Sequence, residues 1–228
     1  MFFRKEDAMG TIKKGILGGF SGKVGNVVGA NWKGIDYMRI KPADVSNPNT
    51  DHQTNQRLKF AAVIRFQQPM TEYIRIGFKA YAVKMSAFNA AFSHNYHEAL
   101  TGSYPSYEID YPKALVSRGN LLGAHNPSIG SELAGSVSVT WTNNSGTSLA
   151  SDSDVAMVVL YNPQLGQAVY LLNAGTRADE KADLIVPAEF SGQTVHGYVT
   201  FLAIDAAVNG QLRNSVSTSN YAGSVVVA

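Results

Sequence analysis

The chain of 228 residues contains no cysteine, and only 16% of its residues are charged. The absence of cysteine excludes disulfide bonds and thiolate metal ligands, but it does not indicate a cellular compartment. No apolar run approaches the roughly 18 residues of a membrane-spanning helix. The start, MFFRKEDAMG, also lacks the apolar stretch of a secretion signal. We therefore expect synthesis as a soluble cytoplasmic protein without a classical signal peptide or a membrane span; its final location is left open, and an extracellular or virion assembly is one option.

Catalytic and cofactor motifs are also missing. A phosphate-binding loop needs a glycine, four residues, and then Gly-Lys-Ser/Thr. Here Gly22-Lys23 is followed by Val24, and Leu17 stands where the first glycine is required. His94 and His97 are spaced for one helix face, but their order with Glu98 is not the His-Glu-x-x-His of zinc proteases. We therefore expect no enzyme, no catalytic or metal site and no cofactor.

The first 42 residues are instead rich in glycine, which interrupts short apolar pieces. Glycine inside a strand usually marks a bend or a close approach of another backbone. We predict short, kinked strands near residues 11–17, 23–29 and 33–40. This segment also carries the candidate contacts for an interface or an acidic partner, which are Lys13, Lys14, Lys23, Trp32, Lys33, Tyr37, Arg39 and Lys41.

Two helical regions follow. Asn47-Pro48-Asn49 predicts a turn, and Thr50 or Asp51 is suited to cap a helix over residues 52–67. Apolar residues at three- and four-residue steps predict a second helical region over residues 78–100. The two regions are expected to pack against each other.

After about residue 123, basic residues become scarce and short β-patterns dominate. Residues 124–128 resemble a linker. Seven predicted strands cover residues 136–142, 155–161, 167–172, 182–187, 195–204, 212–218 and 221–227. Their spacing indicates an antiparallel sandwich of immunoglobulin/fibronectin-III-like type, with Trp141 in its core. The last strand offers candidate contacts at Tyr221, Val225, Val226 and Val227.

The predicted fold class is thus α+β and mostly β, with an N-terminal strand-plus-helix domain over residues 1–122 and a sandwich domain over residues 123–228. Residues 1–100 carry 14 Lys/Arg against 7 Asp/Glu, whereas residues 101–228 carry 5 against 10. Such a contrast suits head-to-tail self-association or an acidic partner, and it also suits pairing of the halves within one molecule. We favour a self-associating structural subunit of a filament, sheath or virion. Nucleic-acid binding by the basic half is the first alternative, and a carbohydrate- or surface-binding module is the second.

Several stretches resemble those of a known family. They are MGTIKKGILGGFSGKVGNVVGANWKGIDYMRIKP from Met9, FKAYAVKMSAFNAAFSHN, YEIDYPKALVSRGNL and VTWTNNSG. They resemble a bacterial family of unknown function, found mostly in Bacteroidota, and the resemblance covers about residues 9–228. It implies no activity. The leading MFFRKEDA departs from the usual start of the family, so Met1 and Met9 both stay candidates for the initiator.

Overall fold

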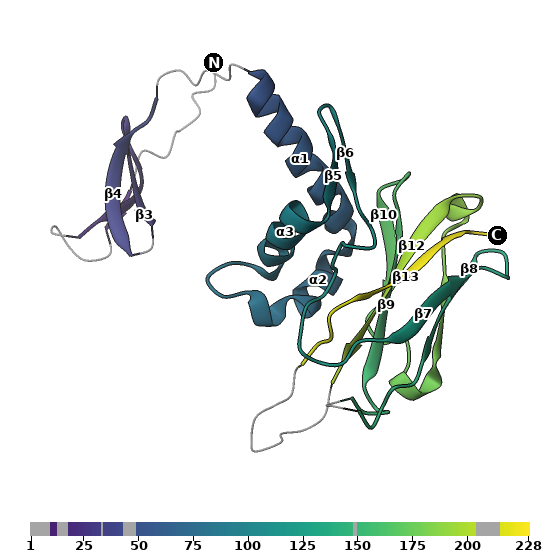
Figure 1. The fold of residues 1–228 in the computed structure, drawn as a ribbon. Helices are drawn as coiled ribbons and strands as arrows, with labels where there is room; N and C mark the ends of the chain where they lie inside the picture. Colours follow the sequence, from purple (N-terminus) through teal and green to yellow (C-terminus); the bar gives the residue numbers. More distant parts are fainter. Residues whose placement is uncertain (1–9, 13–17, 33, 43–48, 148–149, 204–214) are drawn as a thin grey trace, which may run out of the picture. The chain divides into compact units, whose positions relative to one another are not determined.

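The computed structural model describes residues 10–12, 18–32, 34–42, 49–147, 150–203 and 215–228. The chain divides into two compact units, which are unit 1 (residues 1–49) and unit 2 (residues 50–228) (Figure 1). Across the described ranges, no helix is long and apolar enough to cross a membrane.

Unit 1 is a four-stranded antiparallel sheet with the strand order β1-β2-β3-β4. Its strands are β1 (Thr11–Ile12), β2 (Phe20–Val24), β3 (Val27–Trp32) and β4 (Ile35–Ile40). Gly25 turns the chain between β2 and β3 with a φ of +58°, which glycine adopts without a steric penalty. The predicted glycine-rich strands are confirmed with shifted boundaries, and residues 13–17 lie outside the described residues.

The helical part of unit 2 comes next. It contains α1 (Asp51–Gln67), α2 (Thr71–Gly77), α3 (Ala87–Glu98) and a hairpin of β5 (Leu100–Ser103) and β6 (Ser106–Ile109). The Thr50 hydroxyl accepts a hydrogen bond from the Gln53 backbone N–H at 3.3 Å, so Thr50 caps α1 as predicted. Ser86 caps α3 in the same way through Asn89 N–H at 3.1 Å.

Seven strands complete unit 2. They are β7 (His125–Gly130), β8 (Ser136–Thr142), β9 (Val155–Asn162), β10 (Gln167–Leu171), β11 (Lys181–Ile185), β12 (Thr194–Leu202) and β13 (Asn220–Val226). They form two antiparallel sheets with the orders β11-β8-β7 and β10-β9-β12-β13. Trp141 is buried in the core as predicted. The predicted fold class, α+β and mostly β with an antiparallel sandwich, is confirmed.

Strand β9 is buried along all 8 of its residues because it has a core on each face. Its residues in the core of the sandwich are Ala156, Val158 and Leu160. Its residues in the core shared with the helices are Met157, Val159 and Tyr161. The β10-β9-β12-β13 sheet is therefore the middle of three layers, with the helices against one face and the β11-β8-β7 sheet against the other (Figure 1).

Specific contacts tie the helices to this middle sheet. The buried hydroxyl of Tyr73 on α2 donates to the Met157 carbonyl oxygen at 3.0 Å. The rings of Phe66 on α1 and Tyr161 on β9 meet edge to face, with centroids 5.1 Å apart. Because a buried hydroxyl without a partner is destabilising, the Tyr73 bond favours this position of α2.

Two local predictions were wrong. Residues 124–128 are not a linker, because most of them belong to β7, which pairs with β8. The helix predicted over residues 78–100 is interrupted, since Lys84 takes a φ of +58° and Ser86 starts α3 afresh. The predicted strand at residues 212–218 lies partly outside the described residues, and its described part forms only isolated bridges at Val216 and Ser217.

The predicted domain division at residues 122/123 stays a prediction. In the structure this position falls within unit 2, and the compact units divide between Asn49 and Thr50. Unit 2 extends across residues 122/123 because the helices and the sandwich share a core, in which residues of α1 and α2 pack directly against β9 and β12.

Candidate functional site

The two faces of the unit 1 sheet differ in chemistry. Directly paired residues of antiparallel strands project to the same face. The register pairs Val24 with Val27 and Val27 with Ile40, and it also pairs Gly29 with Met38. The apolar face therefore includes Ile12, Phe20, Val24, Val27, Met38 and Ile40 around Gly22 and Gly29, and the paired polar residues Asn31 and Asp36 lie on the same face beside the β3–β4 turn. The mixed face includes Lys23, Val28, Ala30, Ile35, Tyr37 and Arg39, together with Thr11 and Ser21.

The apolar face is largely open to solvent. Met38 is 69% exposed and Ile40 is 77% exposed. Every residue of β4 is exposed, and β4 lies at one edge of the sheet. A sheet usually buries its apolar face against another layer, so an open face of this kind is a candidate interaction surface.

Gly29 makes room for the Phe20 ring at the centre of this face. A Cβ atom built on Gly29 would lie 2.1 Å from the Phe20 carbonyl oxygen and 2.7 Å from the Phe20 ring. No side chain fits at that distance, so Phe20 packs directly on the Gly29 backbone. The Phe20 ring therefore covers the Gly29 backbone, which is buried, and forms the centre of the apolar face.

The predicted basic contacts are only partly brought together. Tyr37 and Arg39 lie on the mixed face, as does Lys23, whereas Lys41 follows the end of β4. Trp32 belongs to β3, but its side chain lies outside what the structure describes. Three predicted contacts also lie outside the described residues, and these are Lys13, Lys14 and Lys33.

The predicted terminal-strand contacts lie in β13, which pairs with β12, or directly after it. Val227 is buried in the sandwich core and Val225 packs against it, whereas Val226 is exposed. Tyr221 joins an aromatic cluster on the middle sheet, where its hydroxyl lies 2.8 Å from His196 Nδ1. The exposed residues of this strand are Ser224 and Val226.

The aromatic cluster continues to Tyr111, whose ring stacks on His196 with centroids 3.7 Å apart and planes inclined by 21°. Burial lowers the pKa of His196 to about 4, so its imidazole is neutral at pH 7. Burial also raises the pKa of Tyr111 to about 12, with smaller contributions from Tyr161 and Glu108. Nothing in the sequence pattern indicated this cluster, because its members come from distant segments.

His94, His97 and Glu98 lie at the C-terminal end of α3 and line a shallow pocket with Arg118. Burial lowers the pKa of His94, and the charge of Arg118 lowers it further. Over the described ranges, no three His, Asp or Glu side chains gather in a way that would hold a metal ion.

Comparison with known proteins places the chain in a family. No curated protein and no solved structure matches it. A family model matches residues 19–219, which is most of the chain. The chain belongs to a family of unknown function (DUF6266).

Proposed function

We propose that this chain is a non-enzymatic structural subunit that associates with further copies of itself through the apolar face of unit 1. The exposure of Met38 and Ile40 on a one-layer sheet carries this proposal. A second copy supplies a layer of the same width and the same apolar pattern. Two such sheets stack about 10 Å apart in a sandwich, which removes both apolar faces from water.

A face-to-face contact of identical surfaces closes into a dimer, so a larger assembly needs a second kind of contact. The charges of the units supply a candidate. Residues 1–49 carry 8 Lys/Arg against 4 Asp/Glu, and residues 50–228 carry 11 against 13. Unit 1 is therefore basic and unit 2 slightly acidic, which favours head-to-tail contacts between dimers. We propose that the assembly is a filament, a sheath or a virion. The family resemblance implies that the protein is of bacterial origin.

Light scattering and sedimentation over a concentration series test this proposal. The intact chain is expected to form dimers and larger species, and roughly 1 M salt should reduce the larger species to dimers by screening. Ile40→Lys should weaken the dimer by about 2 kcal/mol, which is roughly 30-fold in Kd. Ile185→Lys is the matched control, because Ile185 is 85% exposed on β11 of unit 2.

Two results would contradict the proposal. One is a monomer at every concentration of the intact chain. The other is an Ile40→Lys variant that associates as strongly as the Ile185→Lys control, because the contact would then lie outside the apolar face.

The mixed face supports nucleic-acid binding as a second candidate function. Tyr37 and Arg39 are two positions apart on the exposed strand β4, so the Tyr37 ring and the Arg39 guanidinium lie on the same face. Binding of single-stranded DNA or RNA should then weaken with salt and fall on Arg39→Ala, with Arg75→Ala on α2 as the control. Absence of binding at low salt would remove this candidate.

A further inference from the structure

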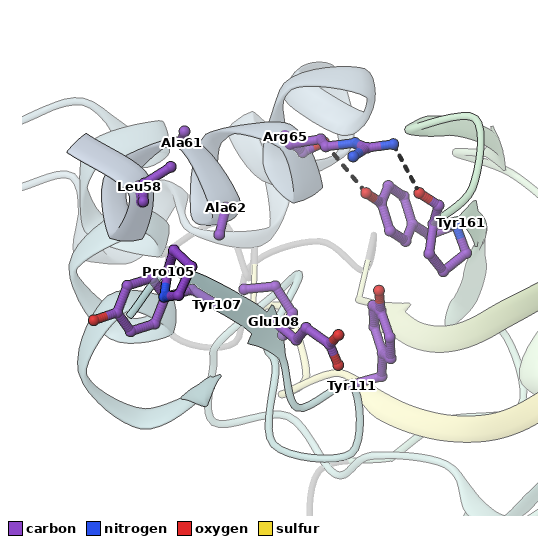
Figure 2. A pocket seen from close by; sticks show the side chains of 11 residues that line it. Leu58, Ala61, Ala62, Arg65, Pro105, Tyr107, Glu108, Tyr111 and Tyr161 are labelled. Carbon is purple, nitrogen blue, oxygen red and sulfur yellow. Dashed lines mark hydrogen bonds between the residues drawn. The ribbon is translucent and has the colours of Figure 1, made fainter. Parts of the chain in front are cut away.

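A groove in unit 2 has the dimensions of a small-molecule site. Its volume is about 610 Å³, within the usual range for ligand pockets. It runs between α1 and the strand β6, and one end is closed by β9 and the turn after it (Figure 2). The lining residues that matter here are Ala61, Ala62, Arg65, Glu108, Tyr111 and Tyr161.

The wall formed by α1 is low because two adjacent residues are alanines. Ala61 is exposed and Ala62 is partly exposed, and Leu58 lies one turn earlier on the same helix. Figure 2 shows Ala62 pointing toward the β6 side of the groove. Larger side chains here would fill the space, so the alanines leave an apolar surface that is accessible to a ligand.

The polar groups of the groove balance in charge. Arg65 Nη2 donates to the carbonyl oxygens of Pro163 at 3.1 Å and Gln164 at 3.0 Å, which fixes the guanidinium in place. Glu108 lies across the groove, and within the described part of the chain its carboxylate forms no salt bridge. One cation and one anion favour a ligand without net charge, because a charged ligand would meet repulsion from one of them.

The aromatic walls are held rigid. Tyr111 is fixed by its stacking on His196, and the Tyr161 ring is supported edge to face by Phe66. The Tyr111 hydroxyl is protonated at neutral pH like that of any tyrosine and can act as a donor, and burial raises its pKa further. Rigid rings with polar ends bind amphipathic ligands at a small entropic cost.

We propose that the groove binds a neutral carbohydrate. A pyranose ring has apolar C–H faces, which suit the tyrosine rings and the alanines of α1. Its hydroxyl groups both donate and accept, so they can pair with the Glu108 carboxylate, the Arg65 guanidinium and the tyrosine hydroxyls. This site is independent of the assembly contact proposed for unit 1, because every lining residue belongs to unit 2.

Titration of the intact chain with soluble oligosaccharides of cellulose, starch, mannan and chitin tests the proposal, with binding followed by calorimetry and by amide chemical shifts. At least one oligosaccharide is expected to bind and to shift amides along α1 and β6. Ala61→Trp places a large ring at the rim of the groove from an exposed helical position and should weaken binding by about ten-fold or more. Ala188→Trp, at an exposed position away from the groove, should bind as the parent chain does.

Glu108→Gln is the second variant, and it removes the acceptor charge while keeping the shape of the side chain. It should weaken binding several-fold without changing the fold, because Glu108 is exposed. The proposal is overturned if no oligosaccharide binds at roughly 10 mM. It is also overturned if binding survives both Ala61→Trp and Glu108→Gln, since the sugar would then lie elsewhere.

Discussion

Strand β4 of unit 1 and strand β9 of unit 2 differ completely in burial. All 6 residues of β4 are exposed, whereas all 8 residues of β9 are buried. Both strands contain a methionine and several other large apolar residues, Ile35, Met38 and Ile40 in β4 and Met157, Val158 and Leu160 in β9. The difference lies in the layers around them, since β9 has a packed layer on each face and β4 has none within its own unit. Apolar content alone does not fix the burial of a strand.

The two methionines give the sharpest test of this contrast. Met157→Lys places a charge in the core between helices and middle sheet, where Met157 is fully buried. We expect a loss of more than about 4 kcal/mol in the free energy of unfolding of unit 2, or no folding. Met38→Lys should change the stability of unit 2 by less than about 0.5 kcal/mol. Urea denaturation followed by tryptophan fluorescence measures both, and similar losses in the two variants would refute the three-layer description.

Two arginines extend the comparison to charge. Arg177 is fully buried, its Nη2 lies 3.0 Å from Asp154 Oδ2, and its guanidinium lies 3.8 Å from the centre of the Phe201 ring. Arg177→Met leaves Asp154 buried without its cation and should cost about 3–5 kcal/mol. Arg39→Met in the exposed β4 should have an effect within about 0.5 kcal/mol.

A double variant separates the ion pair from packing. Adding Asp154→Asn to Arg177→Met removes the buried negative charge that Arg177→Met leaves without a cation. The double variant should therefore recover part of the lost free energy of unfolding relative to Arg177→Met alone, as measured by thermal or urea unfolding. A further loss of stability in the double variant would mean that the carboxylate of Asp154 is satisfied by other groups.

The smallest expected effect concerns pH. Burial lowers the pKa of His196 from 6.5 to about 4, so between these values the unfolded chain binds a proton that folded unit 2 does not. The free energy of unfolding of unit 2 should therefore fall as the pH decreases from about 6.5 to about 4, by about 1–2 kcal/mol after allowance for the partial exposure of His196. His196→Asn should remove this part of the pH dependence in urea titrations. Unit 1 contains no histidine and should lack it. An unchanged slope in the variant would assign the dependence to other groups.

Local signals in the sequence predicted much of the fold. The cap at Thr50, the strand at residues 136–142 and the buried Trp141 all follow from short-range patterns and were confirmed. The interruption near Lys84 was missed because the apolar spacing continues through it, although Ser86 is a recognisable cap. Strand β7 was missed because Pro127 and Asn126 favour a turn, and pairing with β8 outweighs that preference.

The sites were less predictable than the elements. The unbroken apolar run of Val155–Tyr161 was the available signal for a strand buried on both faces, but it does not identify the second layer. The groove joins residues from α1, β6 and β9. Tyr111 and His196 stack on each other although they lie far apart in the sequence. Contacts of this kind depend on tertiary packing, which residue spacing does not encode.

The position of β9 between two layers also determines when the chain can fold as it is synthesised. Helices α1, α2 and α3 leave the ribosome before β9 and β12, which complete their packing surface. Until those strands emerge, Phe66, Met70 and Ile74 have no apolar partner from the middle sheet. A nascent chain halted before β12 therefore displays an apolar helical surface, which is the kind of surface that chaperones bind. Helices and sandwich should reach their native packing together in one late step.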